Sequence, residues 1–153
     1  MTIKIVPCDQ SHEKLIWAWR NDPITRKMSR NSHEIAWAEH QKWFQASLAG
    51  NERKLLIGVM DEEPFGMIRY DIIGEGEFIF NINLNPVFRG RKLSDPFMEK
   101  SIEFLKAQMT VKHIFAEIRI DNRPMNAVFQ KRNWQLYAVE DDFNKYRLTL
   151  ADS

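Results

Sequence analysis

Cationic side chains surround a single glycine in residues 88–94 (FRGRKLS), between a stretch with strand character and a stretch with helix character. Residues 77–84 alternate as a β-strand does, and apolar side chains after residue 94 recur at helical spacing as far as residue 109. A strand that turns directly into a helix leaves several backbone N–H groups unpaired at the positive end of the helix dipole. The segment therefore indicates a local binding site for a phosphate group.

Two further side chains, Glu77 and His40, are candidates for a general base. A carboxylate or an imidazole beside a reacting group can take its proton directly or through water, with a typical gain of about 10²–10⁴-fold. Each also has a purely structural interpretation, Glu77 as a solvated turn residue and His40 as a helix residue at the edge of the core. We expect no metal site, because the remaining histidines lie in different elements without metal-like spacing to one another or to Cys8.

The composition is that of an ordinary globular domain: 153 residues, of which 44% are hydrophobic and 28% charged. With 22 basic and 21 acidic side chains the formal net charge is +1, so no global attraction to nucleic acid or to a membrane is implied. The single cysteine, Cys8, excludes an internal disulfide and fits a reducing compartment. Because no signal-like or membrane-spanning apolar run is visible, we expect a cytoplasmic protein.

The hydrophobic patterns predict a mixed α/β (α+β) domain with about seven strands and four helices. The expected strands cover residues 2–6, 54–60, 65–73, 77–84, 113–120, 135–139 and 145–150. The expected helices cover residues 11–20, about 36–48, about 95–109 and about 123–132. The three middle strands form an antiparallel meander, and the strand, helix and strand that follow form a βαβ unit, so the sheet is mixed.

Two segments resemble the signatures of the GNAT superfamily of N-acetyltransferases. Residues 88–94 resemble its acyl-CoA pyrophosphate loop, whose pattern is Arg or Gln, two residues, Gly, one residue, then Gly or Ala. Residues 122–134 (NRPMNAVFQKRNW) resemble its second signature, N-x-x-(A/S)-x-x-x-Y-x-K-x-G-F, in the same order and at the same spacing. The resemblance implies a single acyl-CoA N-acyltransferase domain over residues 1–153, with a GNAT-like, mostly antiparallel central sheet and acetyl-CoA as cosubstrate.

The same resemblance assigns residues to the cosubstrate. It implies that the pyrophosphate is bound by the loop residues Arg89, Gly90, Arg91, Lys92, Leu93 and Ser94. It further implies that the Leu84 backbone pairs with the pantetheine arm of the cosubstrate. It also implies that Asn122 contacts the pantetheine arm or the helix that carries this arm. The alternative is that Asn122 only satisfies local backbone groups, as asparagine often does in a loop before a proline.

The loop departs from the family pattern at two positions. Lys92 stands where the middle glycine is usual, and its Cβ could obstruct a positive φ or the approach of a phosphate, or its ammonium could bind that phosphate. Ser94, in place of Gly or Ala, can cap the following helix, while Asp95 would repel a nearby pyrophosphate. Further on, Asn133 replaces a glycine after the second signature's helix, where asparagine suits a left-handed position.

Phe129 occupies the position where many GNAT enzymes carry a tyrosine that protonates the leaving thiolate. Phenylalanine cannot donate a proton, so Phe129 would serve only as an aromatic wall against the acyl-CoA. We consider three alternatives: protonation by solvent, donation by Tyr146 or Tyr137, or reduced activity.

The N-terminal part is similar to the branch that acetylates amino groups on nucleotide-linked deoxysugars, including the pseudaminic-acid pathway enzymes. The residues that carry this similarity are Trp19, Arg20, Asn21, Met28, Ile35, His40, Trp43 and Phe44. Arg20 and Arg30 could bind a substrate diphosphate, and Asn81 and Asn83 could contact the substrate from the polar face of their strand. The plain alternatives are a solvated loop and a solvated sheet face.

These observations favour an acetyl-CoA-dependent N-acetyltransferase that acts on a primary amine, most specifically on a nucleotide-linked amino sugar. Because Cys8 is the only thiol and lies near the first strand, we expect direct transfer in a ternary complex. The alternatives are an acetyltransferase for a protein N-terminus or a small amine, and a non-catalytic acyl-CoA-binding module. Strands exposed at the sheet edge after Trp134 would suit a homodimer.

Overall fold

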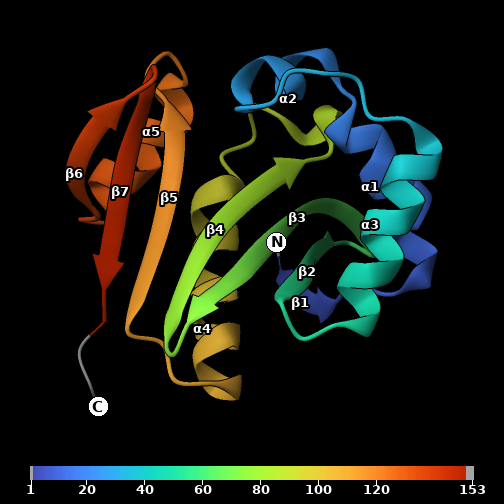
Figure 1. The fold of residues 1–153 in the computed structure, drawn as a ribbon, viewed down its shortest axis with the longest axis horizontal. Coiled ribbons are helices and arrows are strands. Elements are labelled where there is room, and N and C mark those ends of the chain that lie inside the picture. Colours follow the sequence, from blue (N-terminus) through green and yellow to red (C-terminus); the bar gives the residue numbers. More distant parts are fainter. Residues whose placement is uncertain (1, 151–153) are drawn as a thin grey trace.

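A seven-stranded sheet runs through the computed structural model, with helices on both of its faces (Figure 1). The structure describes residues 2–150. The strands are β1 Ile3–Pro7, β2 Arg53–Met60, β3 Glu63–Gly74, β4 Glu77–Leu84, β5 His113–Arg119, β6 Gln135–Glu140 and β7 Phe143–Thr149, in the spatial order β1-β2-β3-β4-β5-β7-β6. The helices are α1 Glu13–Arg20, α2 Pro23–Met28, α3 Trp37–Ala49, α4 Ser94–Gln108 and α5 Arg123–Lys131. All neighbouring strands are antiparallel except β4 and β5.

The sequence-based prediction of the strands is confirmed, but it missed one helix. Helix α2 was expected to be a loop, because the segment before it was read only as the end of α1. The Asp22 side chain accepts hydrogen bonds from the backbone N–H groups of Ile24 and Thr25, at 3.1 Å each, and Pro23 occupies the first turn. Aspartate as N-cap followed by proline is a strong start signal. At six residues α2 is too short to show a helical period.

The two faces of the sheet carry separate hydrophobic cores. On the face covered by α4 and α5, the larger core joins aromatic side chains of strands and helices, including Phe80, Phe97, Phe129 and Trp134. On the opposite face, α1 and α3 bury a smaller core over β2 and β3. Figure 1 shows that α1 and α3 cover only one half of this second face, so the face of β5 and β7 beside them carries no helix.

Strands β4 and β5 pair over three residues only. The parallel register joins Glu77 to His113, Phe78 to Ile114 and Ile79 to Phe115. Beyond Ile79 the two strands diverge, and Figure 1 shows the separation widening toward the end of β4. Residues 80–84 of β4 pair with β3 alone, so their other backbone edge has no strand partner.

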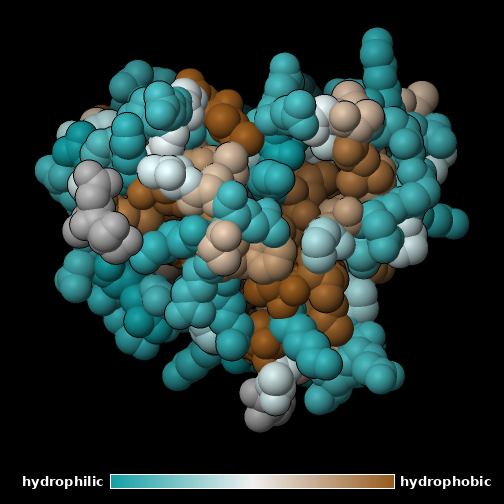
Figure 2. All heavy atoms as spheres, turned by 90° about the horizontal axis from the view of Figure 1, so that it is seen from below, coloured by the Kyte–Doolittle hydropathy of each residue, from teal (hydrophilic) through white to brown (hydrophobic). Residues whose placement is uncertain are grey.

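The face of the molecule seen from below is mainly polar. In the view from below, hydrophilic side chains cover most of the face, and apolar ones gather along its middle (Figure 2). Strand β6 forms one edge of the sheet, and its side chains Leu136, Tyr137 and Val139 are exposed. Within residues 2–150 no helix is long and apolar enough to cross a membrane.

Candidate active site

The backbone N–H groups at the end of the loop between β4 and α4, in residues 90–95, have no acceptor within residues 2–150. After β4 ends, a short 3-10 turn covers Pro86–Phe88, and α4 begins at Ser94. None of residues 90–95 donates its backbone N–H to an acceptor in the described part of the chain. The buried side chains of Phe88 and Leu93 anchor the two ends of the loop. A run of free donors at the positive end of a helix suits an anionic phosphate.

Two residues of the loop adopt the left-handed backbone conformation. Gly90 has φ +78°, and a Cβ built there would meet no atom within 4 Å, so its outer side is open. Lys92 has φ +57° in spite of its side chain, at a cost of about 1 kcal/mol. The lysine therefore does not prevent the backbone turn that a glycine would make at this position.

The start of α4 differs from the expectation in a way that favours anion binding. Leu93, not Ser94, is the N-cap residue, and no side chain caps the helix. Asp95 faces α5, where its carboxylate accepts from Arg132 Nε at 2.6 Å and from Lys131 Nζ at 3.1 Å. The hydrogen bond from Arg132 lowers the pKa of Asp95 and outweighs the opposing effect of burial. The negative charge of Asp95 is thus balanced by two cations rather than left beside the free N–H groups.

The Arg89 side chain does not point into the loop. Its guanidinium binds the Asp22 carboxylate and donates to the Thr25 hydroxyl at 2.9 Å, so it ties the loop to the start of α2. Burial of Asp22 would raise its pKa, but hydrogen bonds from Arg89 and from the α2 backbone reverse that effect, and the pKa is lowered. Arg89 is committed to a structural ion pair here.

A buried polar network joins α5 to the end of β5 and to β7, and its central residue, Asn126, was missed in the sequence. The Asn126 amide donates to the backbone oxygens of Arg119 at 2.9 Å and Asn122 at 2.8 Å. Its Oδ1 accepts from the Tyr146 hydroxyl at 2.6 Å and from Asn144 Nδ2 at 2.9 Å. The sequence feature that could have predicted this role is the spacing of four residues between Asn122 and Asn126. At this spacing the Asn126 side chain lies beside the first turn of α5 and can reach the backbone there.

The second signature forms α5 with the side chains mostly in structural roles. Asn122 is the N-cap residue and accepts from the Met125 N–H at 3.4 Å. Asn133 follows the helix with φ +62°, which confirms its predicted left-handed position. Phe129 is fully buried, stacks on the Tyr146 ring at a centroid distance of 5.0 Å and meets Phe80 edge-on at 5.8 Å.

None of the three candidate acid–base residues has a free reactive atom near the divergence of β4 and β5. His40 is fully buried, with Nδ1 3.1 Å from Arg20 Nη1 and Nε2 2.7 Å from the Glu13 backbone oxygen. Since arginine only donates, Nδ1 is the acceptor and Nε2 carries the proton. Burial lowers the pKa of His40, which agrees with a neutral ring. The imidazole is a bridge between α1 and α3.

Of the other two candidates, Glu77 lies far from the divergence, and the hydroxyl of Tyr146 is not free. Glu77 is the first residue of β4, opposite His113 in the paired end of the two strands. At 3.3 Å per residue it lies about 23 Å along the strand from Leu84. Tyr146 is buried, and its hydroxyl is committed to Asn126. The sequence pattern alone does not show these distances and partners.

Three arginines gather around one tryptophan on the face opposite to α4. The guanidinium carbons of Arg20, Arg69 and Arg53 lie 4.3, 5.7 and 5.8 Å from the centroid of the Trp43 ring. Asp71 Oδ1 lies 3.1 Å from Arg69 Nε and 3.4 Å from Arg53 Nε. Burial, together with the charge of Arg69, lowers the pKa of Arg20 to about 10. This group, which we call the arginine cluster, holds three cations with one carboxylate in ion-pair contact.

The arginine cluster contains one of the predicted substrate residues and neighbours two others. Arg69 stands opposite Asn81 in the β3–β4 register, and Asn83 lies on the same face of β4 two residues further along. Arg30 lies elsewhere: its guanidinium pairs with Glu117 at 2.9 Å and covers the Phe143 ring at 4.4 Å. Arg53 and Arg69 were missed because their closeness to Arg20 depends on how α3 packs over β2 and β3.

Together, the free N–H groups before α4, the divergence of β4 from β5 and the mixed seven-stranded sheet define an acyltransferase fold. Residues 3–134 match the family model described as an acetyltransferase (GNAT) domain, and the chain belongs to this family. The family assignment confirms the recognition made from the two signatures, and the fold class is confirmed with it.

Individual relatives are distant in sequence but similar along almost the whole chain. Acetyltransferase PseH of Campylobacter jejuni is 23% identical over 140 residues, which cover 92% of this chain and 86% of that protein. The structure of this PseH in complex with acetyl coenzyme A aligns with a TM-score of 0.76 at 18% identity, over 98% of this chain and 100% of that one. Spermidine N-acetyltransferase from Vibrio cholerae, in complex with CoA and spermine, aligns with a TM-score of 0.87 at 9% identity, over 96% and 95%.

Proposed function

We propose that this GNAT acetyltransferase uses acetyl-CoA to N-acetylate the amino group of a nucleotide-linked amino sugar, as a single domain over residues 1–153. The arginine cluster is the observation that carries the choice of acceptor. Three guanidinium groups with one paired carboxylate leave an excess of positive charge, which matches the negative charge of a diphosphate. The match to PseH agrees with the resemblance to the amino-sugar branch seen in the sequence.

The residues on the donor side fit acetyl-CoA. The free N–H groups of residues 90–95 would hold its pyrophosphate, with Arg91 and Lys92 beside them. The unpaired backbone edge of residues 80–84, which includes Leu84, would pair with the pantetheine arm, and Phe129 would form part of the apolar wall below it. When bound, acetyl-CoA supplies an acetyl thioester. The complexes of PseH with acetyl coenzyme A and of the Vibrio cholerae enzyme with CoA support this assignment.

The same cluster argues against polycationic acceptors. Spermine, which is present in the Vibrio cholerae complex, carries several positive charges, and like charges at short range repel. Arg69 is mostly buried, so water screens its charge incompletely. A negatively charged acceptor is therefore favoured over a polyamine on electrostatic grounds.

The protein contributes positioning rather than a proton relay in this proposal. The amine nitrogen attacks the thioester carbonyl directly, the C–S bond breaks, and the thiolate takes its proton from water. His40, Glu77 and Tyr146 lack a free reactive atom near the diverging strands, so solvent also takes the proton that the amine releases. Of the three alternatives that we considered because Phe129 cannot donate a proton, we therefore propose the first, in which solvent protonates the leaving thiolate (the solvent route).

The Phe129→Tyr variant tests the solvent route. We expect its turnover to stay within about threefold of the wild type, because proton donation does not limit the reaction, and steady-state kinetics measure this. A rise of about tenfold or more would show that a missing acid limits the enzyme. Phe104→Tyr, a change of the same kind on α4, is the control for the added hydroxyl.

The acceptor is tested with a panel of amines. Free thiol release from acetyl-CoA is measured with a UDP-linked amino sugar, spermidine, an aminoglycoside and a peptide with a free N-terminus. We expect the UDP-linked sugar to give the highest kcat/KM and UDP alone to compete with it. A higher value for spermidine, the aminoglycoside or the peptide would contradict the proposed acceptor. Calorimetric binding of acetyl-CoA without thiol release for any amine would favour the non-catalytic module.

A further inference from the structure

One arginine of the arginine cluster differs from the other two in its partners. Arg53 and Arg69 share the Asp71 carboxylate, with their Nε atoms 3.4 and 3.1 Å from its Oδ1. Within residues 2–150 no ion pair includes Arg20, and the only hydrogen bond of its side chain joins Nη1 to His40 Nδ1 at 3.1 Å. Arg20 is therefore held by an imidazole and not by a carboxylate.

The tautomer of His40 leaves the charge of Arg20 in place. Nε2 donates its proton to the Glu13 backbone oxygen at 2.7 Å, so Nδ1 is an uncharged hydrogen-bond acceptor for the guanidinium. A carboxylate at position 40 would orient the guanidinium as well, but it would also neutralise it. The neutral ring thus gives Arg20 a fixed direction while its positive charge stays available to an anion.

Packing fixes the imidazole in this position. His40 is fully buried, and its ring centroid lies 5.9, 5.8 and 5.7 Å from those of Trp37, Trp43 and Phe44. The Arg20 guanidinium lies over the Trp43 ring, 4.3 Å from its centroid. Two groups therefore set the position of Arg20, an indole ring and an imidazole. Of these two, only the imidazole changes its hydrogen-bonding character with pH.

We propose that His40 is a positioning residue for the amine substrate, whose neutral imidazole holds the Arg20 guanidinium where a phosphate of the nucleotide-linked sugar binds. The inference rests on the proposed substrate and on its diphosphate at the arginine cluster. His40 itself does not touch the substrate, because both of its nitrogens are engaged inside the protein. Protonation of Nδ1 would place one N–H group against another, so the guanidinium would lose its orientation.

The groups that face His40 favour the neutral ring. Burial and, after it, the positive charge of Arg20 lower the pKa of His40. The hydrogen bond to the Glu13 backbone and the Glu13 carboxylate oppose this shift but do not reverse it. The next charged groups belong to α3, β2 and β3 and lie around Arg20 and the Trp43 ring: Glu39, Arg53, Arg69 and Asp71.

The positioning role gives the pH dependence a definite sign. As pH falls through the lowered pKa of His40, below the ordinary value of about 6.5, the ring gains a proton and Arg20 loses its hydrogen-bond acceptor. Binding of the diphosphate should therefore weaken in acid. A histidine that acted only through its charge would have the opposite effect, because an added positive charge attracts a diphosphate.

Calorimetry with UDP-glucose tests the inference without turnover. This probe carries the diphosphate, has no amine and stays ionised between about pH 5 and pH 8, so only groups of the protein titrate. We expect the wild-type Kd to rise about tenfold from about pH 7.5 to about pH 5. His40→Asn keeps a hydrogen-bond acceptor in the place of Nδ1 and does not titrate, so its Kd should stay within about threefold of the wild-type value at neutral pH and should not change with pH. His40→Leu has the same size without the acceptor, and its Kd should be about tenfold higher at neutral pH.

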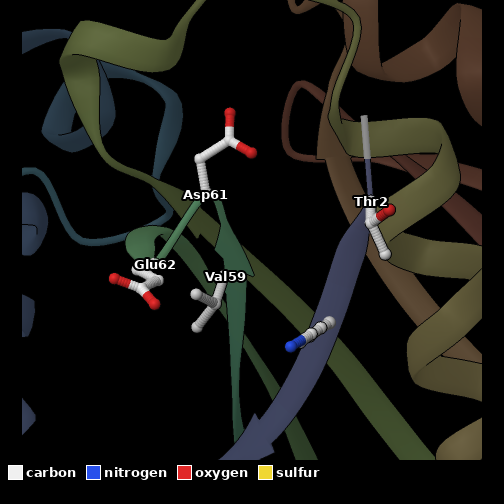
Figure 3. Close-up of a pocket in the computed structure, with 5 residues that line it drawn as sticks. Thr2, Val59, Asp61 and Glu62 are labelled. Atoms are coloured by element: carbon white, nitrogen blue, oxygen red, sulfur yellow. The ribbon is translucent and has the colours of Figure 1, made fainter.

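Two control variants remove titratable groups far from the arginine cluster. His113→Gln replaces a histidine at the start of β5. Asp61→Asn replaces a carboxylate in the turn after β2, about 26 Å along this strand from Arg53. Figure 3 shows Asp61 there, in a hollow that is lined by Thr2, Lys4, Val59, Asp61 and Glu62. Asparagine suits the left-handed backbone of this position, φ +50°. Both variants should keep the wild-type pH profile.

The outcomes separate the positioning role from the function on which it rests. The kcat for a UDP-linked amino sugar and the Kd for acetyl-CoA should not change in either His40 variant. A wild-type Kd for UDP-glucose that falls or stays constant in acid would overturn the positioning role. Equal Kd values for His40→Asn and His40→Leu, or an equal loss of acetyl-CoA affinity, would overturn it as well.

Thermal unfolding shows whether the variants are folded. If His40→Leu is not, the pH profiles of the wild type and His40→Asn still decide the question. Absence of UDP-glucose binding to the wild type at every pH would overturn both the proposed substrate and the positioning role, whereas acetyl-CoA binding would still support the acetyltransferase.

Discussion

The two sides of β4 prepare for negatively charged ligands in different ways. On the α4 side, the donors are backbone N–H groups of residues 90–95, and they are free. On the opposite side, the donors are the guanidinium groups of the arginine cluster, and they are held by Trp43, Asp71 and His40. The path of the chain fixes the first set, whereas packing between four elements fixes the second. The α4 side, where we place the acetyl donor, is called the donor side, and the opposite side, where we place the amine substrate, is called the acceptor side. Ligand binding on the donor side should therefore tolerate side-chain changes, whereas ligand binding on the acceptor side should not.

The largest effect should come from the backbone on the donor side. Gly90→Val places a β-branched residue at φ +78° and fills the open space outside the loop. We expect the Kd for acetyl-CoA to rise about 100-fold, measured by calorimetry. Gly74→Ala, at the last residue of β3, is the control and should leave the Kd unchanged. A Kd for Gly90→Val near the wild-type value would show that the loop backbone is not what holds the pyrophosphate.

Asp22 lies two residues after Arg20 of the arginine cluster and connects this part of the chain to the loop before α4, because it caps α2 and binds Arg89. Asp22→Ala should lower the free energy of unfolding by about 2 kcal/mol at neutral pH, measured by denaturant titration. The pKa of Asp22 is lowered in the folded state, so its ionic contribution is present above the unfolded value, about 3.9, and is lost as pH falls through the folded value. The difference between variant and wild type should thus shrink below about pH 4. If the loss of unfolding free energy in Asp22→Ala does not change with pH, it comes from the lost hydrogen bonds of the helix cap and not from the charge of Asp22.

The loss of one arginine from the arginine cluster should weaken the binding of the amine substrate only. Arg69→Gln should raise KM for a UDP-linked amino sugar about tenfold and leave the calorimetric Kd of acetyl-CoA unchanged. Lys54→Gln, on the neighbouring strand with its side chain on the other face of the sheet, is the matched control. Equal losses for both substrates would mean that the two sides are not independent.

The smallest effect concerns the acidic residue nearest the free N–H groups. Asp95→Asn removes one negative charge, leaves Lys131 without its ionic partner and leaves Arg132 paired with Glu99 alone. At low salt, acetyl-CoA should bind about threefold more tightly, while the variant loses about 1 kcal/mol of stability. Calorimetry at two salt concentrations and thermal unfolding measure both effects. Weaker binding of acetyl-CoA would show that Asp95 positions the loop rather than opposes the ligand.

The sequence was sufficient for most of the fold, because strand alternation and helical spacing are local patterns. All seven strands and four of the five helices were predicted, and α2 was missed because six residues are too few to show a period. The loop before α4 was also predictable, since its donors belong to the backbone and need only a strand, a turn and a helix start. The left-handed Asn133 followed from its place after a helix.

The state of individual side chains could not be predicted, because their partners come from distant parts of the chain. Arg89 was expected beside the pyrophosphate, but its guanidinium binds Asp22, 67 residues away. His40 was a candidate base until Arg20 and the Glu13 backbone were seen to engage both of its ring nitrogens. Asn126 was overlooked because its importance lies in its contact with Tyr146 on another element.

The three residue pairs between β4 and β5 have a mechanical consequence for the whole sheet. They are the only strand ladder that joins β1–β4 to β5, β6 and β7 within residues 2–150, so beyond Ile79 the two parts of the sheet are held together by side-chain packing and not by backbone hydrogen bonds. A molecule that lies in the opening between β4 and β5 therefore touches both parts of the sheet.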